Sequence, residues 1–406
     1  MGRQRAPNIT ALMQVFIPKE SLPGEARVAA TPETVARLVK RGVKVVVQAG
    51  AGERAFFNDE AYRTAGAEVV DAPAPTAAAL VARVQPPSEE EIQALHEGSV
   101  LVSHIFATAA RARAEQIAAR GVTTFAMELI PRTSRAQTMD ALSSQATVAG
   151  YKAVILAAAH LDKLCPLLMT AAGTVKPARA VIFGAGVAGL QAIATARRLG
   201  CVVEATDIRA AAKEQVESLG ARFIDVPGAE DMEDERGYAR EADEEFLQRQ
   251  REEVARRVEG ADIVITTAQI PGRPAPRLVG EALVRSMRPG SVIVDLAVES
   301  GGNCELSVPG EIVERFGVKV IGLRNLPAGV PRDASLLYAK NVFALLGLMF
   351  DGEGAFALDL EDDILAGCLL TRGGEIVHAP TLEQLAAGAG RDAHLALHPA
   401  RRSPLR

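Results

Sequence analysis

The sequence predicts an α/β protein built from two Rossmann-like domains with parallel sheets. Short apolar runs alternate with helical patterns in two separate regions of the chain, which is typical of parallel α/β layers. A glycine-rich turn follows an apolar run in the second region, and two long helical stretches link the regions. The length of 406 residues and the 48% hydrophobic content agree with two domains, each with its own core.

The first domain is predicted from the region that precedes Ala136. A helix over Pro32–Arg41 is expected to begin at its proline, because proline suits the first helical turn and Thr31 precedes it. Other helical segments fall between the apolar runs. The expected strands are Val15–Ile17, Val43–Gln48, Glu68–Val70, Leu80–Val84, Val100–His104 and Thr123–Met127.

Two long stretches of helix-forming residues are expected to cross between the domains. Ala136–Leu161 contains many alanines and few helix breakers, so it predicts a long helix that leaves the first domain. Ser335–Met349 predicts a helix that returns, followed by a last piece at about 351–383. The first domain is therefore expected to be discontinuous, formed by 13–140 and 335–383, with a ligand-binding cleft between the domains.

The intervening region, 141–334, predicts the second Rossmann-like domain, and 384–406 predicts a flexible tail. Residues 229–259 interrupt this domain with a dense mixture of charges. Two interpretations stay open: a solvated loop with an exposed helix, or a mobile flap that carries Tyr238. The expected strands are Ala178–Gly184, Cys201–Asp207, Arg222–Asp225, Asp262–Thr267, Ser291–Ala297 and Val318–Leu323.

Composition excludes several classes of function. The net charge is −5, from 50 acidic and 45 basic residues, which argues against a nucleic-acid-binding surface. The longest uncharged apolar run, Ala180–Ala196, contains glycines and is shorter than the ~18–20 residues of a membrane span. The 4 cysteines lie far apart in the sequence and form no CxxC pair, so reduced thiols are expected rather than a disulfide framework or a metal site. No signal peptide is expected, and Met13 is a plausible alternative start.

The strongest local signal is a GxGxxG motif that follows an apolar strand and opens a helix at Val187. Gly184 permits the tight turn, and Gly186 lets the backbone approach a pyrophosphate. Gly189 allows the helix to pack closely on the strand. The free N–H groups at the start of such a helix attract phosphate. The motif therefore predicts a dinucleotide site.

Asp207, at the end of the next strand, indicates which dinucleotide is bound. A carboxylate there accepts from ribose hydroxyls and repels a 2′-phosphate, which favours NAD over NADP. Arg209 keeps the alternative open, because it could pair with a 2′-phosphate or reach the pyrophosphate or solvent. Ala268 and Gln269 follow another strand end and are expected to line the cofactor pocket.

A polar segment at the end of the first domain carries Arg132, Gln137, Asp140 and Ser143. These side chains could simply cap and solvate the start of the long helix. They could equally bind the carboxamide and ribose of a nicotinamide and set its orientation. The residues alone leave both interpretations open.

Several long stretches carry a resemblance to a known family. They include IPRTSRAQTMDALSSQATVAGYKAVILAA, FGAGVAGLQAIATARRLGCVVEATDIR and MRPGSVIVDLAVESGGNCELS. From Met13 to His378 the chain resembles the NAD(H)-binding portion of the alpha subunit of proton-translocating NAD(P) transhydrogenases. Alanine dehydrogenases are related to that family.

The resemblance implies roles for individual residues. The polar segment would fold over the nicotinamide, with Gln137 orienting the ring for hydride transfer, and Tyr238 would lie on a loop that closes over the nucleotide. The nicotinamide-facing, catalytic group would be Arg132, Gln137, Asp140 and Ser143. The NAD(H)-binding group would be Gly184, Gly186, Val187, Gly189, Asp207, Arg209, Ala268, Gln269 and Tyr238.

The resemblance also implies an assembly. The chain would act as a homodimer beside an NADP(H)-binding component, the beta subunit, and a separate membrane-spanning component that translocates protons. Direct hydride transfer would join NAD(H) here to NADP(H) on the partner. The chain would lie on the cytoplasmic side, peripheral to the inner membrane.

Alanine dehydrogenase is the competing enzyme, and it needs a carboxylate anchor and an acid/base. Where that pattern has a lysine, a catalytic histidine and a catalytic aspartate, this chain has Arg83, His104 and Glu299. Arginine can hold a carboxylate but does not exchange its proton near neutral pH, so the apparatus is incomplete. A third hypothesis is a non-catalytic NAD-sensing module, against which the polar segment argues.

Overall fold

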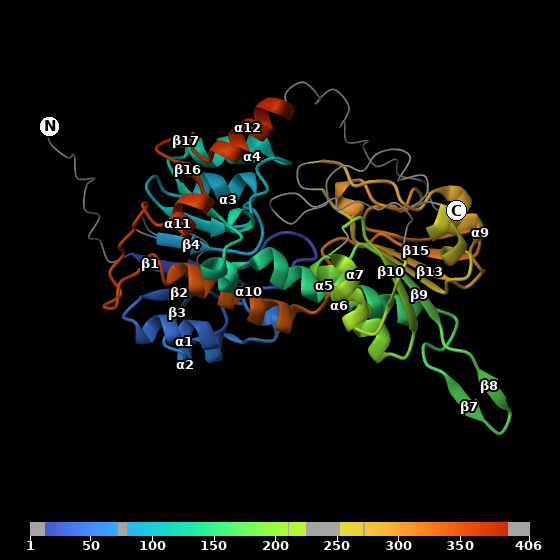
Figure 1. Ribbon diagram of the computed structural model, residues 1–406. Coiled ribbons are helices and arrows are strands. Elements are labelled where there is room, and N and C mark those ends of the chain that lie inside the picture. The colour runs from blue at the N-terminus through green and yellow to red at the C-terminus, as the bar shows by residue number, and fades with distance from the viewer. Residues whose placement is uncertain (1–12, 72–78, 210, 225–251, 271–272, 389–406) are drawn as a thin grey trace, which may run out of the picture.

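The computed structural model describes residues 13–71, 79–209, 211–224, 252–270 and 273–388. The described chain forms two α/β units, with the long helices α5 (Ala141–His160) and α10 (Pro331–Leu346) between them (Figure 1). The predicted fold class is confirmed. Within the described residues, no helix has the length and apolar character that a bilayer crossing requires.

The first sheet has 8 strands in the described part of the chain, in the order β17-β16-β6-β5-β4-β1-β2-β3. Strands β1 to β6 are parallel, whereas β16 runs antiparallel to β6 and β17 antiparallel to β16. The last two strands come from the far end of the sequence. The strands are β1 (Gln14–Ile17), β2 (Val45–Gln48), β3 (Glu68–Val70), β4 (Ala79–Ala82), β5 (Val100–Ser103), β6 (Thr123–Ala126), β16 (Leu369–Arg372) and β17 (Glu375–Ile376).

Both faces of this sheet are covered by helices, so most residues of its central strands are buried. Val15 and Ile17 contribute to one core and Phe16 to the other, as the alternation of side chains along a strand requires. Helices α1, α2, α10 and α11 supply the first core, and α3 and α4 the second. The helices are α1 (Pro32–Lys40), α2 (Asp59–Thr64), α3 (Glu89–Ala94), α4 (Arg111–Ala119), α11 (Asp363–Cys368) and α12 (Ala379–Gly388).

The second sheet has 7 strands among the described residues, in the order β11-β10-β9-β12-β13-β15-β14. All neighbours are parallel except β14 and β15. The strand order reverses between β9 and β12, the point where open α/β sheets bind ligands. The elements are β9 (Arg179–Phe183), α6 (Val187–Arg198), β10 (Val202–Thr206), α7 (Ala212–Ser218), β11 (Arg222–Phe223), β12 (Ile263–Thr266), α9 (Glu281–Ser286), β13 (Val292–Asp295), β14 (Ile312–Arg315) and β15 (Val318–Ile321).

Helix α5 belongs to both units. Ala141 contributes to the first core and Ala153 to the second. Near its middle, α5 crosses α6 so closely that a Cβ built on Gly150 would lie 2.1 Å from the Ala188 carbonyl oxygen. The crossing fixes the start of α6 relative to the start of α5.

The predicted start of the long helix was wrong. Residues Ser134–Met139 form the 3-10 helix η3, and α5 begins only after Asp140, whose Oδ1 accepts from the backbone N–H of Ser143 at 2.9 Å. An aspartate with this bond is a strong N-cap, so it ends the preceding turn and starts a new helix. Helix α10 begins at Pro331, earlier than expected, because proline suits the first turn.

Among the described residues, five strands were not predicted from the sequence: β7 (Leu168–Thr170) and β8 (Gly173–Val175), which form a hairpin, the edge strand β14, and β16 and β17 of the first sheet. The hairpin projects away from the second unit (Figure 1). Its residues are exposed, so no burial pattern marks them as strands. Helix α12 extends to Gly388, into the expected tail, and most of the charged stretch 229–259 lies outside the described residues.

Candidate functional site

The glycine-rich turn has the backbone geometry that each glycine was expected to provide. Gly184 has a φ of +91°, a conformation that favours glycine. A Cβ on Gly189 would lie 1.8 Å from the Gly184 carbonyl oxygen, so α6 packs directly on the turn. A Cβ on Gly186 would meet no described atom within 4 Å. Val187 follows as the first residue of α6 and is partly exposed.

The open space at Gly186 is the observation that fits a dinucleotide. Gly186 is the N-cap of α6 and offers no side chain to satisfy the first N–H groups of the helix. These donors, together with the helix dipole, form a cradle for an anion. A bound pyrophosphate would occupy the place that a side chain at this position would fill.

Asp207 and Arg209 form an ion pair beside this turn. The Asp207 carboxylate accepts from the backbone N–H of Ala185 at 2.6 Å and of Arg209 at 2.9 Å. It also accepts from the Arg209 Nε at 2.9 Å and Nη2 at 3.0 Å. Burial opposes ionisation, but these hydrogen bonds hold the pKa of Asp207 below its ordinary value. Arg209 is thus folded onto Asp207, and a ribose hydroxyl must compete with it for the carboxylate.

The loop after β12 completes this side of the sheet. The Thr267 hydroxyl donates to the carbonyl of Phe183 at 3.0 Å, which ties the loop to the glycine-rich turn. Asn303, a buried residue, accepts from the backbone N–H of Ala268 at 3.0 Å and donates to its carbonyl at 2.9 Å. Gln269 donates to the carbonyl of Leu296 at 3.1 Å. Sequence reasoning missed Asn303, whose only signal was a polar residue after a glycine pair.

In the polar segment of the first domain, the side chain of Gln137 is exposed to solvent. The neighbours Ala136 and Met139 are buried and anchor η3, whereas Gln137 is exposed and its side-chain amide makes no hydrogen bond to another described residue. Arg132 is also exposed. The capping interpretation of Asp140 and Ser143 holds, because the Ser143 hydroxyl also donates to Asp140 Oδ2 at 2.5 Å.

Asn341, on α10, holds the polar segment through hydrogen bonds. Its Nδ2 donates to the carbonyl of Thr138 at 2.8 Å, and its Oδ1 accepts from the Ser144 hydroxyl at 2.7 Å. A buried amide that bridges two turns restricts the segment on both sides of Asp140. Sequence reasoning missed Asn341, although an asparagine inside an apolar helical stretch was a visible signal.

The structure therefore places the predicted residues in two groups, one at each end of the first half of α5. The glycines, Asp207, Arg209, Ala268 and Gln269 gather around the start of α6. The polar segment precedes Ala141, about 14 Å along α5 from the crossing at Gly150. Tyr238 lies outside the described residues, and the roles of these residues and the interdomain cleft stay predictions.

A buried charge network lies in the first unit, centred on Arg27. Its guanidinium donates twice to Glu25, from Nε at 2.8 Å and from Nη2 at 2.6 Å. It also donates to Gln145 on α5 at 2.8 Å and to Asn325 at 2.9 Å. Burial opposes ionisation of Glu25, but the hydrogen bond and charge of Arg27 lower its pKa to about 2. The guanidinium is occupied by the protein's own side chains.

Arg83 and His104, at the positions of the dehydrogenase's lysine and catalytic histidine, also have partners within the protein. Arg83 pairs with Glu91 at 2.9 Å and lies 3.5 Å from Glu20. His104 is buried and holds its Nδ1 3.0 Å from the carbonyl oxygen of Val84. Burial lowers the pKa of His104 to about 4, so the ring is neutral at pH 7. Its ring lies between Phe106 and Tyr338, 5.3 Å from each centroid, which is the packed state expected of a structural histidine.

Burial raises the pKa of two carboxyl groups near these residues. Glu128 accepts from the backbone N–H of Ile105 at 3.0 Å and Phe106 at 2.5 Å, and burial raises its pKa to about 7. Glu20 accepts from the backbone N–H of Val84 at 2.6 Å, and its pKa is also raised to about 7 by burial, against the opposing charge of Arg83. Both carboxylates fix loops at the carboxyl ends of the first sheet.

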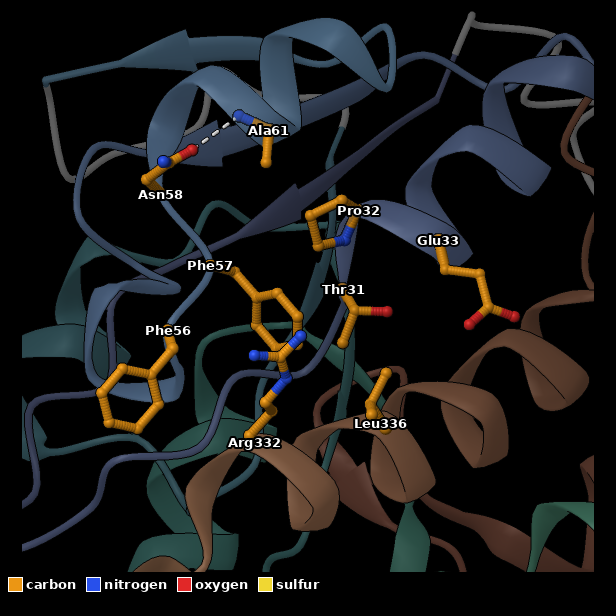
Figure 2. Close-up of a pocket in the computed structure, with 9 residues that line it drawn as sticks. All are labelled: Thr31, Pro32, Glu33, Phe56, Phe57, Asn58, Ala61, Arg332 and Leu336. Atoms are coloured by element: carbon orange, nitrogen blue, oxygen red, sulfur yellow. Dashed lines mark hydrogen bonds between the residues drawn. The ribbon is translucent and has the colours of Figure 1, made fainter.

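One surface pocket, of about 330 Å³, lies elsewhere. It opens between the start of α1, the turn before α2 and α10, and is lined mainly by apolar and aromatic side chains (Figure 2). Phe57 lies beside Arg332 there, with 5.9 Å from the guanidinium carbon to the ring centroid. None of its lining residues is a predicted site residue. The described residues also contain no group of three or more histidine, cysteine or acidic side chains that could hold a metal.

Two Rossmann-like sheets, one of which carries an open glycine-rich turn, define a two-domain dinucleotide-binding α/β protein. Sequence models of the alanine dehydrogenase/PNT family match both domains: the N-terminal domain over residues 16–149 and the C-terminal domain over residues 153–379. The chain belongs to this family.

Three known proteins show how the chain relates to the branches of the family. It is 50% identical over 376 residues to the first portion of the NAD(P) transhydrogenase alpha subunit of Rhodospirillum rubrum, covering 90% of this chain and 98% of that protein. The transhydrogenase structure from Sinorhizobium meliloti superposes with a TM-score of 0.82 at 49% identity, covering 89% of this chain and 99% of that one. Alanine dehydrogenase of Bacillus subtilis (strain 168) is 30% identical over 92% of this chain and 95% of its own length.

Proposed function

We propose that this chain is the NAD(H)-binding component of a proton-translocating, Si/Re-specific NAD(P)+ transhydrogenase. One contrast carries the proposal: the dinucleotide turn at Gly186 is open, whereas Arg27 and Arg83 are paired with buried or half-buried carboxylates and His104 is packed in the core as a neutral ring. An alanine dehydrogenase needs free groups to anchor and deprotonate an amino acid. The likeness to a transhydrogenase subunit over nearly its whole length supports the same choice.

The residues of this chain bind and orient. The N–H groups at the start of α6 hold the pyrophosphate, and Asp207 holds the adenosine ribose once Arg209 yields. Gln137, the exposed amide of the polar segment, orients the nicotinamide, with Arg132, Asp140 and Ser143 around it. Bound NAD(H) supplies or receives the hydride. Catalysis rests on alignment of the reacting groups and exclusion of water.

The proposed assembly is a homodimer of this chain, an NADP(H)-binding component (the beta subunit) and a membrane-spanning component that translocates protons. It places the chain on the cytoplasmic side, peripheral to the inner membrane. The β7–β8 hairpin supports the homodimer, because it exposes large apolar side chains away from either core. An isolated two-stranded hairpin is marginal in water, so a second surface is expected to cover it.

The first prediction tests the hydride-transfer role. Mixed with the NADP(H)-binding and membrane components, the chain should catalyse transhydrogenation, and Gln137→Asn should slow it by about 100-fold, because a misplacement of about 1 Å has such an effect. NADH affinity should change by less than about 3-fold, since the other contacts remain. Gln93→Asn, an exposed glutamine in α3, is the matched control and should behave as the original chain.

Other outcomes of that mixture discriminate between the hypotheses. Equal losses of rate and affinity in Gln137→Asn would remove the orienting role. NAD reduction that depends on alanine would support the dehydrogenase, and NADH binding without transfer would support the sensor. Light scattering of the active complex should show two copies of this chain, and a single copy would contradict the homodimer.

The second prediction concerns Asp207. Asp207→Ala should weaken NADH binding by about 10-fold, the effect of about 1.4 kcal/mol in lost hydrogen bonding. It should strengthen NADPH binding relative to NADH, because the repelling carboxylate is gone and Arg209 is released. Titration with both dinucleotides measures the ratio. The double variant that also carries Arg209→Ala should lose the gain for NADPH, and unchanged selectivity in Asp207→Ala would exclude a ribose contact.

A further inference from the structure

Two of the four cysteines lie next to each other at the base of the projecting hairpin. The carbonyl of Cys165 accepts from the backbone N–H of Ala178 at 3.0 Å, and the carbonyl of Ala178 accepts from Val202 at 2.9 Å. Ala178 thus joins the segment of Cys165 to the start of β10, which Cys201 precedes. A Cβ on Gly200 would lie 2.8 Å from the Cβ of Pro166. Pro166, which follows Cys165, therefore lies against Gly200, which precedes Cys201.

The two thiols face the same core of the second unit. Cys201 is buried in it, and Cys165 packs against it while remaining partly exposed. Burial, and after it the neighbouring Cys165 side chain, raises the pKa of the Cys201 thiol. Both are free. Such a pair, with one accessible and one shielded sulfur, has the arrangement of an attacking and a resolving thiol.

We propose that Cys165 and Cys201 form a reversible dithiol–disulfide site, oxidised by low-molecular-weight disulfides, that ties the base of the β7–β8 hairpin to the start of β10. The site is independent of the dinucleotide turn and of the proposed transhydrogenase activity.

The chemistry is a two-step exchange with a small disulfide such as oxidised glutathione. The Cys165 thiolate attacks one sulfur of that disulfide, a mixed disulfide forms, and one glutathione thiolate leaves. The Cys201 sulfur, on losing its proton, then attacks Cys165 Sγ and releases the second glutathione. Two protein thiols are oxidised, one small disulfide is reduced, and two glutathione thiols are produced. Burial raises the pKa of Cys201 to about 12, so the second step is expected to be the slower one.

The other two cysteines provide an internal comparison. Cys304 and Cys368 are fully buried in two different cores, each apart from the pair described above. Neither has an accessible thiol to begin the exchange. They are therefore expected to stay reduced under conditions that oxidise Cys165 and Cys201.

The experiment treats the full chain with oxidised glutathione, blocks the remaining thiols with iodoacetamide and maps the peptides by mass spectrometry. The expected result is a peptide that links Cys165 to Cys201, with Cys304 and Cys368 alkylated after denaturation, and reversal by dithiothreitol. Cys201→Ser should stop at a glutathione adduct on Cys165. Cys165→Ser should leave Cys201 unmodified, since its thiol is shielded.

If a variant fails to fold, peptide mapping of the oxidised original chain is sufficient to test the proposed disulfide. A glutathione adduct on Cys165 that persists without the linked peptide would overturn the proposal, as would no reaction at Cys165. A link between Cys165 and either of the deeper cysteines would also overturn it. A gain in thermal midpoint on oxidation that is absent from Cys165→Ser would support the tie between the hairpin base and β10.

Discussion

Replacing Gly189 with alanine is expected to cost about 3 kcal/mol or more in the free energy of unfolding and to abolish NADH binding. The new Cβ would lie 1.8 Å from the Gly184 carbonyl oxygen and 3.3 Å from the Thr267 hydroxyl. Neither neighbour can yield freely, because Gly184 is held at a φ of +91° and its N–H donates to Thr206 at 2.8 Å. Denaturant unfolding and NADH titration measure the two losses.

Gly186→Ala is the matched control from the same motif. Its Cβ meets no described atom within 4 Å, and its φ of −74° suits alanine. The free energy of unfolding should therefore change by less than about 0.5 kcal/mol. NADH affinity should still fall, because the methyl group occupies the space of the pyrophosphate. A stable Gly189→Ala would refute the close packing, and normal NADH binding by Gly186→Ala would place the pyrophosphate elsewhere.

Glu25→Gln is the second substitution with a large expected effect, a loss of about 3–5 kcal/mol in the free energy of unfolding. The carboxylate is fully buried and pairs with Arg27 through two hydrogen bonds of 2.6 and 2.8 Å. Removing its charge leaves a buried guanidinium without an anion, although Gln145 and Asn325 still accept from it. Glu60→Gln, which breaks an exposed pair with Arg63, should cost less than about 0.5 kcal/mol.

The pH dependence of stability gives a second readout for Glu25. Its pKa is about 2, against 4.5 in the unfolded chain. A lowered pKa means that its contribution, about 3 kcal/mol, is complete above pH 4.5 and is lost as the pH falls towards 2. Glu25→Gln should flatten this acid limb. Glu20 and Glu128, whose pKa values are raised from 4.5 to about 7, act with the opposite sign. Their contribution to the free energy of unfolding is complete below pH 4.5 and is lost as the pH rises through 7. An unchanged acid limb in Glu25→Gln would contradict the assignment.

Most strands could be predicted because their side chains are buried on both faces of a parallel sheet. The edge strand Glu68–Val70 is only partly buried and was still predicted to the residue, and the other predicted strands differ from the observed ones mainly at their ends. The exposed β7, β8 and β14 left no such apolar signal. The long helix was predicted with the wrong start, because the composition of Ala136–Met139 favours a helix whereas Asp140 caps a new one.

The dinucleotide turn was readable for a different reason: its components are local. Gly184, Gly186 and Gly189 act within one turn, and Asp207 bonds to the same turn through Ala185. What could not be read was that Arg209 folds back onto Asp207, since an arginine side chain can reach in several directions.

By itself, the sequence determined the two α/β units, the glycine-rich turn and the location of the polar segment. Each of these depends on backbone conformation or strand burial, which follow from residues close together in the chain. Tertiary structure alone decided which distant groups meet. It joined Arg27 to Asn325, held the polar segment with Asn341 and brought the segments of Cys165 and Cys201 together. Such contacts depend on how helices and strands pack, and their partners carry no mark of each other in the sequence.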